Sequence, residues 1–250
     1  MEELKMDRKK AWKIGLLSAL FPTVVAVLAI GVIVFVFQYV SNNGLVEIER
    51  KTGYYAQLAE YAPKKATVFF GDSITEICPI EDLYGDYAEQ SGSPVINRGI
   101  SSETTASMLA RVNESVIALQ PRNLVMLMGI NDLNQGIAPA EAAGNIRAII
   151  QRVKEESPQT NIVLQSVYPT DIKRESFYEP LHIFADNDQV LALNGLLAEL
   201  AAEENIRYVD LTSVLADESG YLRDDYTYDG VHPSTSGYLA VRDLIIAELV

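Results

Sequence analysis

The hydrophobic positions of this 250-residue chain follow two different patterns. From Ile14 to Val40 the residues are uncharged and mostly apolar without a break. From about residue 65 onward, short apolar runs alternate with longer segments in which apolar residues recur at helical spacing. The first pattern predicts a helix that crosses a membrane, and the second predicts an α/β domain.

Short apolar runs bounded by turn residues are typical of buried strands in a parallel sheet. They lie at Ala66–Phe70, Val95–Asn97, Leu124–Met128, Ile162–Val167 and Tyr208–Leu211, and helical patterns between and after them cover Thr104–Leu119, Pro139–Glu156, Val190–Glu204 and Ser236–Leu249. This alternation predicts a three-layer α/β/α sandwich around a central parallel five-stranded sheet, with right-handed crossovers. Ligands of such sheets bind outside the carboxyl ends of the strands.

The uncharged stretch at residues 14–40 would form a helix of about 40 Å, against a hydrocarbon core of about 30 Å. Five Lys/Arg fall within the first 13 residues, whereas the segment after the stretch has none until Arg50. The positive-inside rule then places the N-terminus in the cytoplasm and the rest of the chain outside the cell membrane. A cleaved signal peptide is the alternative, although no convincing cleavage site follows the stretch. We therefore expect a cytoplasmic basic N-terminus at 1–13, a single-pass transmembrane anchor at 14–40, a connector at 41–64 and a catalytic domain at 65–250.

The charge balance narrows the range of partners. The formal net charge is −14, and because the first 13 residues are basic, the negative charge lies beyond the predicted anchor. Such a domain would be repelled by nucleic acids, so we expect no nucleic-acid partner. The single cysteine, Cys78, excludes an intrachain disulfide, and the Cys and His residues lack metal-ligand spacing, so we expect no metal site. The oligomeric state stays open.

Polar, glycine-bearing segments follow three of the predicted strands, and a fourth precedes the last predicted helix. They read GDSIT at 71–75, RGIS at 98–101, GIND at 129–132 and DGVHP at 229–233. Each is a weak signal alone. Because the ends of parallel strands meet at one edge of a sheet, the four together predict a site at that edge.

The four segments resemble the sequence blocks of the SGNH hydrolases, also called GDSL-type esterases and lipases. The Ser, Gly, Asn and His that give the family its name correspond to Ser73, Gly99, Asn131 and His232, and the resemblance covers about residues 65–250. The first block departs only in Ile74, where many members have Leu. The resemblance implies a flavodoxin-like SGNH fold, hydrolysis of acyl esters without metal or organic cofactor, and a bacterial, membrane-anchored member of the family.

The residue types fit nucleophilic catalysis. A serine hydroxyl needs a base, and only His182 and His232 supply an imidazole. His232 has Asp229 three residues before it in a glycine-containing loop, and that carboxylate could orient the ring toward Ser73. His182 also has a carboxylate three residues before it, Glu179, but Pro180 intervenes and the segment does not precede the final helix, so we favour His232. For the oxyanion hole, the candidates are the N–H groups of Ser73 and Gly99 and the side-chain amide of Asn131. A turn or helix cap is the alternative role for Asn131.

These expectations describe a serine esterase that cleaves lipid acyl or carbohydrate O-acetyl esters through an acyl-enzyme on Ser73. An O-acyltransferase acting on a cell-surface glycan, or a non-catalytic surface-binding protein, are the alternatives. We expect the substrate pocket to be formed mostly by two loops, Ile77–Gln90 and Asp171–Gln189.

Overall fold

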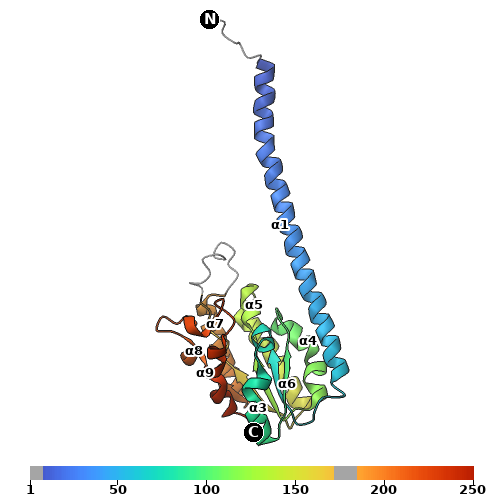
Figure 1. The fold of residues 1–250 in the computed structure, drawn as a ribbon, viewed down its shortest axis with the longest axis vertical. Coiled ribbons are helices and arrows are strands. Elements are labelled where there is room, and N and C mark those ends of the chain that lie inside the picture. The colour runs from blue at the N-terminus through green and yellow to red at the C-terminus, as the bar shows by residue number, and fades with distance from the viewer. Residues whose placement is uncertain (1–7, 172–184) are drawn as a thin grey trace. The chain divides into compact units, whose positions relative to one another are not determined.

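The computed structural model describes residues 8–171 and 185–250, apart from the side chains of residues 8–20, 22–23 and 36–43. The chain divides into two compact units, Met1–Glu47 and Ile48–Val250. Helix α1 (Arg8–Leu58) forms the described part of the first unit, and its last turns belong to the second (Figure 1). The predicted connector is therefore helical as far as Leu58. Many side chains of the predicted span lie outside the described set, and within that set no helix is long and apolar enough to cross a membrane.

The second unit contains the predicted central sheet of five parallel strands. The strands are β1 (Thr67–Gly71), β2 (Val95–Gly99), β3 (Asn123–Leu127), β4 (Asn161–Gln165) and β5 (Arg207–Val209). Their order is β2-β1-β3-β4-β5, and every pair is parallel. In β1 and β3 every residue is buried, which explains why these strands are continuous apolar runs. The order reverses between β1 and β3, where parallel sheets of this kind place their ligand crevice.

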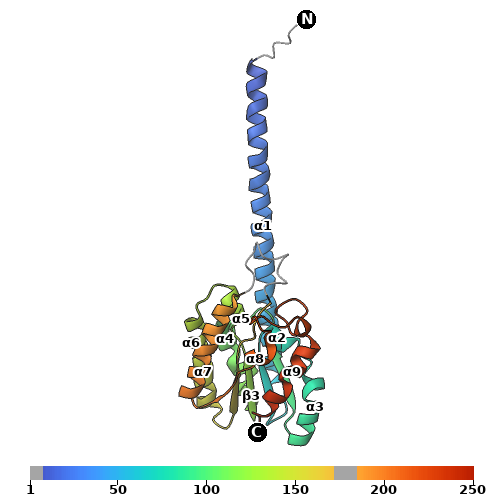
Figure 2. The same cartoon turned by 90° about the vertical axis from the view of Figure 1, so that its left-hand side faces the viewer.

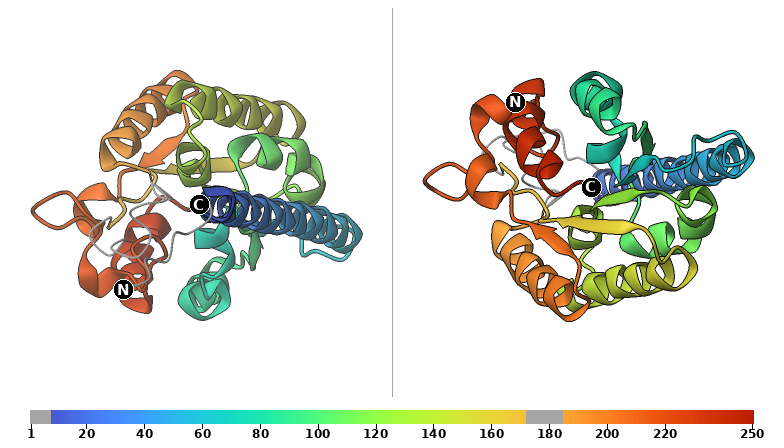
Figure 3. Two further views of the ribbon diagram at one scale, coloured as in Figure 1. Left: turned by 90° about the horizontal axis from the view of Figure 1, so that it is seen from above. Right: turned by 90° about the horizontal axis from the view of Figure 1, so that it is seen from below.

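Helices cover both faces of the sheet (Figures 2 and 3). On one face lie α4 (Thr105–Ser115), α6 (Pro139–Glu156) and α7 (Asn187–Glu203), which pack in that order. On the other lie α3 (Ile80–Ser91), α8 (Thr212–Leu215) and α9 (Thr235–Ile246). Short helices α2 (Ser73–Glu76) and α5 (Ile130–Asn134) follow β1 and β3, and the 3-10 helices Ile117–Leu119 and Asp224–Tyr226 complete the described elements.

The sequence expectations missed helix α3. Residues Ile77–Gln90 were expected to form a pocket loop, yet most of them are helical from Ile80 onward. The boundaries of α3 carry signals in the sequence, since Pro79 precedes the first helical residue and Gly92 ends the helix with a φ of 65°. Most of the other expected loop, Asp171–Gln189, lies outside the described residues, and α7 begins near its end.

Candidate active site

The candidate nucleophile lies at the turn between β1 and α2. Gly71 ends the strand, Asp72 caps the helix, and Ser73 is the first helical residue. A Cβ at Gly71 would lie 2.2 Å from the Thr75 hydroxyl oxygen and 2.3 Å from the carbonyl oxygen of Leu127, so this tight turn requires glycine. The hydroxyl of Ser73 is thereby held at the carboxyl end of the sheet, as the sequence predicted.

The loop before α9 brings His232 to this hydroxyl. The distance from His232 Nε2 to Ser73 Oγ is 2.9 Å, and the distance from His232 Nδ1 to Asp229 Oδ2 is 2.6 Å. The other oxygen of Asp229 accepts the backbone N–H groups of Val231 at 3.0 Å and His232 at 2.8 Å. One carboxylate therefore holds both the loop and the imidazole ring.

Asp229 stays ionised in this arrangement. Its partial burial alone would raise the pKa, but the hydrogen bonds from His232 and Val231 outweigh that effect and leave the pKa of Asp229 below its usual value. A carboxylate beside Nδ1 fixes the tautomer of the ring and leaves Nε2 to accept a proton. The alternative base, His182, lies outside the described residues.

Gly99 differs from its expected role. Its N–H donates to the side-chain oxygen of Asn97 at 2.8 Å, so this donor is already in use. A Cβ at this position would lie 2.3 Å from the backbone nitrogen of Glu76, which shows that Gly99 allows β2 to pack closely against α2. Glycine is therefore required at position 99 for backbone packing, whereas the sequence analysis expected it to allow close approach of a substrate.

Ser102 has the features that were expected of Gly99, and sequence reasoning missed it because it is not a glycine. Its φ of 66° lies in the left-handed region, which is uncommon for residues other than glycine. Among the described residues, the backbone N–H groups of Ser102 and Ser73 have no hydrogen-bond partner. Asn131 lies against the same loop, since its side-chain amide donates to the carbonyl oxygen of Glu103 at 3.0 Å. Such an amide has two N–H donors, and this bond uses only one.

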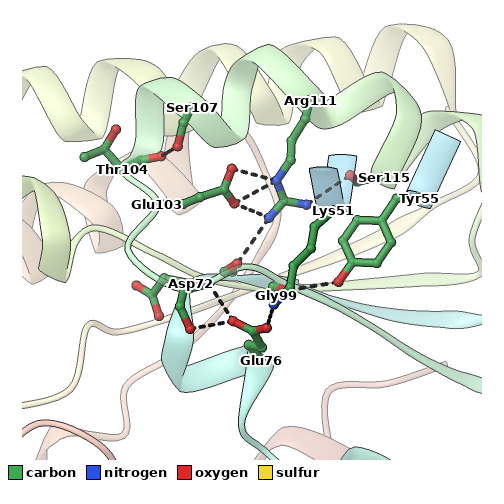
Figure 4. A network of polar contacts seen from close by, with 12 residues as sticks. Lys51, Tyr55, Asp72, Glu76, Gly99, Glu103, Thr104, Ser107, Arg111 and Ser115 are labelled. Atoms are coloured by element: carbon green, nitrogen blue, oxygen red, sulfur yellow. Dashed lines mark hydrogen bonds and ion pairs between the residues drawn. The ribbon is translucent and has the colours of Figure 1, made fainter. Parts of the chain in front are cut away.

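A buried ion pair holds the far side of this loop. Glu103 and Arg111 are 0% and 2% exposed, and the guanidinium of Arg111 contacts both carboxylate oxygens of Glu103 (Figure 4). Arg111 also donates to Ser115 at 2.9 Å and to the carbonyl oxygen of Gly71 at 3.3 Å. The pair therefore joins α4 to the loop after β2 and to the turn before the nucleophile. Nothing in its sequence spacing indicated this contact.

Two more titratable groups lie near the nucleophile. Asp72 is fully buried, and desolvation raises its pKa to about 7 even though Oδ1 accepts the N–H of Ile74 at 2.9 Å. Burial also raises the pKa of the Cys78 thiol to about 12. Because the thiolate is the reactive form, Cys78 is a packing residue here.

Comparison with known proteins identifies related esterases and acylhydrolases. The model of the GDSL-like lipase/acylhydrolase family matches residues 69–240. The human platelet-activating factor acetylhydrolase IB subunit alpha1 is 28% identical over 175 residues, which cover 70% of this chain and 71% of the relative. The isoamyl acetate-hydrolyzing esterase of Saccharomyces cerevisiae is 28% identical over 202 residues, covering 72% of this chain and 83% of the yeast protein.

A solved structure gives a similar result. A Streptococcus pneumonia protein, linked by its description to platelet activating factor, superposes with a TM-score of 0.76 at 29% sequence identity. The match covers 84% of this chain and 98% of the streptococcal chain.

Proposed function

The chain belongs to the GDSL-like lipase/acylhydrolase family and is a carboxylic ester hydrolase, and we propose that it cleaves short acyl esters, foremost acetyl esters, through an acyl-enzyme on Ser73. The observation that carries this proposal is the continuous set of contacts from Asp229 through His232 to the Ser73 hydroxyl. A serine is a weak nucleophile until a base removes its proton, and this arrangement supplies one.

The reaction has two steps. The Ser73 Oγ attacks the acyl carbon while its proton passes to Nε2 of His232, and the carbonyl oxygen becomes an oxyanion. His232 then gives that proton to the leaving alcohol, the bond to the alcohol breaks, and the acyl group remains on Ser73. A water molecule deprotonated by His232 then attacks the acyl carbon. The bond from that carbon to Ser73 Oγ breaks, His232 returns the proton to Oγ, and the acid is released. Asp229 stabilises the imidazolium that forms in each step.

The oxyanion is stabilised by N–H donors. We assign the N–H of Ser73, the N–H of Ser102 and the free amide hydrogen of Asn131 to this role. Support comes from the unpartnered state of the two backbone donors within the described residues, and from the contact of Asn131 with Glu103 next to Ser102. Gly99 has an indirect role, because it shapes the end of β2 that leads into the loop.

Exposure of the catalytic groups supports hydrolysis over acyl transfer. Within the described residues, the side chain of His232 is 30% exposed and that of Asp229 is 50% exposed. Water therefore reaches the imidazole that must activate it. An acyltransferase has to exclude water from its acyl-enzyme, which these exposures do not favour.

The names of two relatives support the proposed acetyl preference. The human and yeast proteins both carry names that refer to acetyl esters, and they match 70% and 72% of this chain. The proposed substrates are thus O-acetyl groups on lipids or carbohydrates. Longer acyl chains are the competing substrate class.

A series of 4-nitrophenyl esters from acetate to decanoate tests the proposal, with Ser73→Ala as the matched control. We expect kcat/KM to be highest for the acetate and the Ser73→Ala variant to lose at least ~10³-fold of the rate. Highest activity on the decanoate would refute the acetyl preference. Near-normal activity of the variant would refute the nucleophile.

We also propose that residues 14–40 anchor the enzyme to the cell membrane with the catalytic domain outside. The uncharged stretch and the preceding basic residues support this location. After alkaline carbonate extraction of cell membranes, an anchored chain stays in the pellet at full length. Release into the supernatant, or a shortened chain that begins after the stretch, would contradict the anchor.

A further inference from the structure

Two residues near the end of α1 contact the elements around the candidate oxyanion loop, which we define as residues 99–105. They are Lys51 and Tyr55, one helical turn apart and both half-buried in the second unit. Side chains four residues apart share one face of a helix. This face of α1 is thus directed at the active-site region, although it lies in the segment that the sequence suggested was only a connector.

Lys51 reaches the loop through Glu76, the last residue of α2. The Nζ of Lys51 forms an ion pair with Oε1 of Glu76 (Figure 4). The other oxygen, Oε2, accepts both the backbone N–H of Ser101 at 2.6 Å and its hydroxyl at 2.5 Å. Charge-assisted bonds of this kind are stronger than neutral ones and restrict the geometry of both partners.

Tyr55 contacts the start of the same loop. Its hydroxyl donates to the carbonyl oxygen of Gly99 at 3.0 Å, and its ring lies under the guanidinium of Arg98, 4.6 Å from the ring centroid. Burial raises the pKa of Tyr55, so the hydroxyl keeps the proton that it donates. The carbonyl group of Gly99 is thereby fixed by a side chain from α1.

Both sequence neighbours of Ser102 are fixed by contacts with side chains from other elements. Ser101 is bound by Glu76, and Glu103 is bound by Arg111 and by Asn131. The left-handed φ of Ser102 costs free energy for a residue with a Cβ, so the loop adopts it only because its neighbours are fixed. Loss of a neighbour's contact would let Ser102 relax and turn its N–H away.

From these contacts we infer that Lys51, acting through Glu76, and Tyr55 are positioning residues for the esterase reaction, holding the loop that presents the Ser102 N–H to the oxyanion. The inference rests on the proposed function of Ser73 and its oxyanion hole. It assigns a role in catalysis to the helix that precedes the catalytic domain. Lys51 and Tyr55 do not need to touch the substrate for this role.

The test uses full-length Lys51→Met, Glu76→Gln and the double variant, with 4-nitrophenyl acetate as substrate. Rates are divided by the concentration of active sites, titrated with an organophosphonate, so that unfolded protein does not count. We expect Lys51→Met to lower kcat about tenfold with KM changed less than twofold. The fall in kcat should not exceed the ~10²–10³-fold loss that follows removal of one whole oxyanion donor.

Three comparisons separate positioning from general stability. Lys51→Arg should restore kcat, and Lys64→Met, which removes an exposed lysine before β1, should leave it unchanged. The double variant should lose no more than Glu76→Gln alone, because both residues act along one path. Affinity for an acetyl trifluoromethyl ketone, whose adduct with Ser73 carries an oxyanion, should fall by the same factor as kcat.

Several results would overturn the inference. Wild-type kcat in both Lys51→Met and Glu76→Gln would do so, as would a loss confined to KM or an additive double variant. If the wild-type chain hydrolyses the ester and Ser73→Ala does not, such a failure concerns the positioning residues alone. If the wild-type chain hydrolyses no ester, the proposed function fails and the inference fails with it.

Discussion

Replacing Asp72 by Asn should remove a pH-dependent loss of stability that the buried carboxyl imposes on the wild-type chain. The Asp72 side chain is fully buried, and its Oδ2 has no hydrogen-bond partner among the described residues. Burial raises the pKa of Asp72 to about 7, whereas an aspartate in an unfolded chain ionises near ~3.9. Between these values the folded chain keeps a proton that the unfolded chain releases. The free energy of unfolding therefore falls as the pH rises through this range.

The size of this effect follows from the difference between the two pKa values. A difference of about 3 corresponds to a loss of about 4 kcal/mol between pH 4 and pH 7. This is an upper bound, because an ionised carboxylate attracts water or rearranges its surroundings. Asn at this position retains an oxygen for the N–H of Ile74 and does not titrate. The cost of its unpartnered amide N–H is the same at every pH.

Urea unfolding of both proteins between pH 4.5 and pH 8, followed by circular dichroism, measures the difference. The stability of the wild type relative to Asp72→Asn should fall by about 2 to 4 kcal/mol across this range. Asp186→Asn is the matched control, because Asp186 also caps a helix, that of α7, but is exposed. This control removes an exposed carboxyl in place of a buried one. An equal change of stability with pH for the two variants, each relative to the wild type, would refute the reasoning.

Three further substitutions test the packing and the chemistry of the site. Gly99→Ala places a Cβ 2.3 Å from the backbone of α2 and should lower the free energy of unfolding by at least ~2 kcal/mol, measured in urea. The control Gly144→Ala lies in open space within α6 and should raise the free energy of unfolding by about 0.5–1 kcal/mol. Equal effects of the two substitutions would contradict the packing role of Gly99. Arg111→Met leaves Glu103 buried without its cation and should lower the free energy of unfolding by about 3–5 kcal/mol. Adding Glu103→Gln should recover part of that loss. Wild-type stability of Arg111→Met would contradict a paired, buried charge. Asp229→Asn should lower kcat for 4-nitrophenyl acetate by about 10⁴-fold while KM changes little, and a loss below tenfold would show that the carboxylate does not orient His232.

The strands were predictable because their signal is local. Ala66–Phe70 and Leu124–Met128 are apolar runs that become the fully buried β1 and β3. The proximity of Ser73 and His232 was also predictable, since the ends of parallel strands meet at one edge. The chain has two histidines, each with a carboxylate three residues before it, and the glycine-containing loop before the last helix favoured His232 as the base.

The oxyanion loop could not be assigned from sequence for a physical reason. Glycine is required both where a substrate approaches the backbone and where another helix does, and the sequence is the same in the two cases. Gly99 serves the second requirement, while the left-handed position in the loop is occupied by Ser102, which has no sequence signature. The ion pair of Glu103 and Arg111 joins a loop to a helix, so no periodic pattern marks it.

The most direct test of the nucleophile is covalent labelling by a fluorophosphonate, followed by peptide mass spectrometry of the full-length chain. We predict one adduct, on Ser73, and its loss in the Ser73→Ala variant. Labelling should also slow strongly in His232→Ala, since the imidazole accepts the hydroxyl proton. An adduct on Ser101 or Ser102 in the wild-type chain, with Ser73 unmodified, would contradict the account.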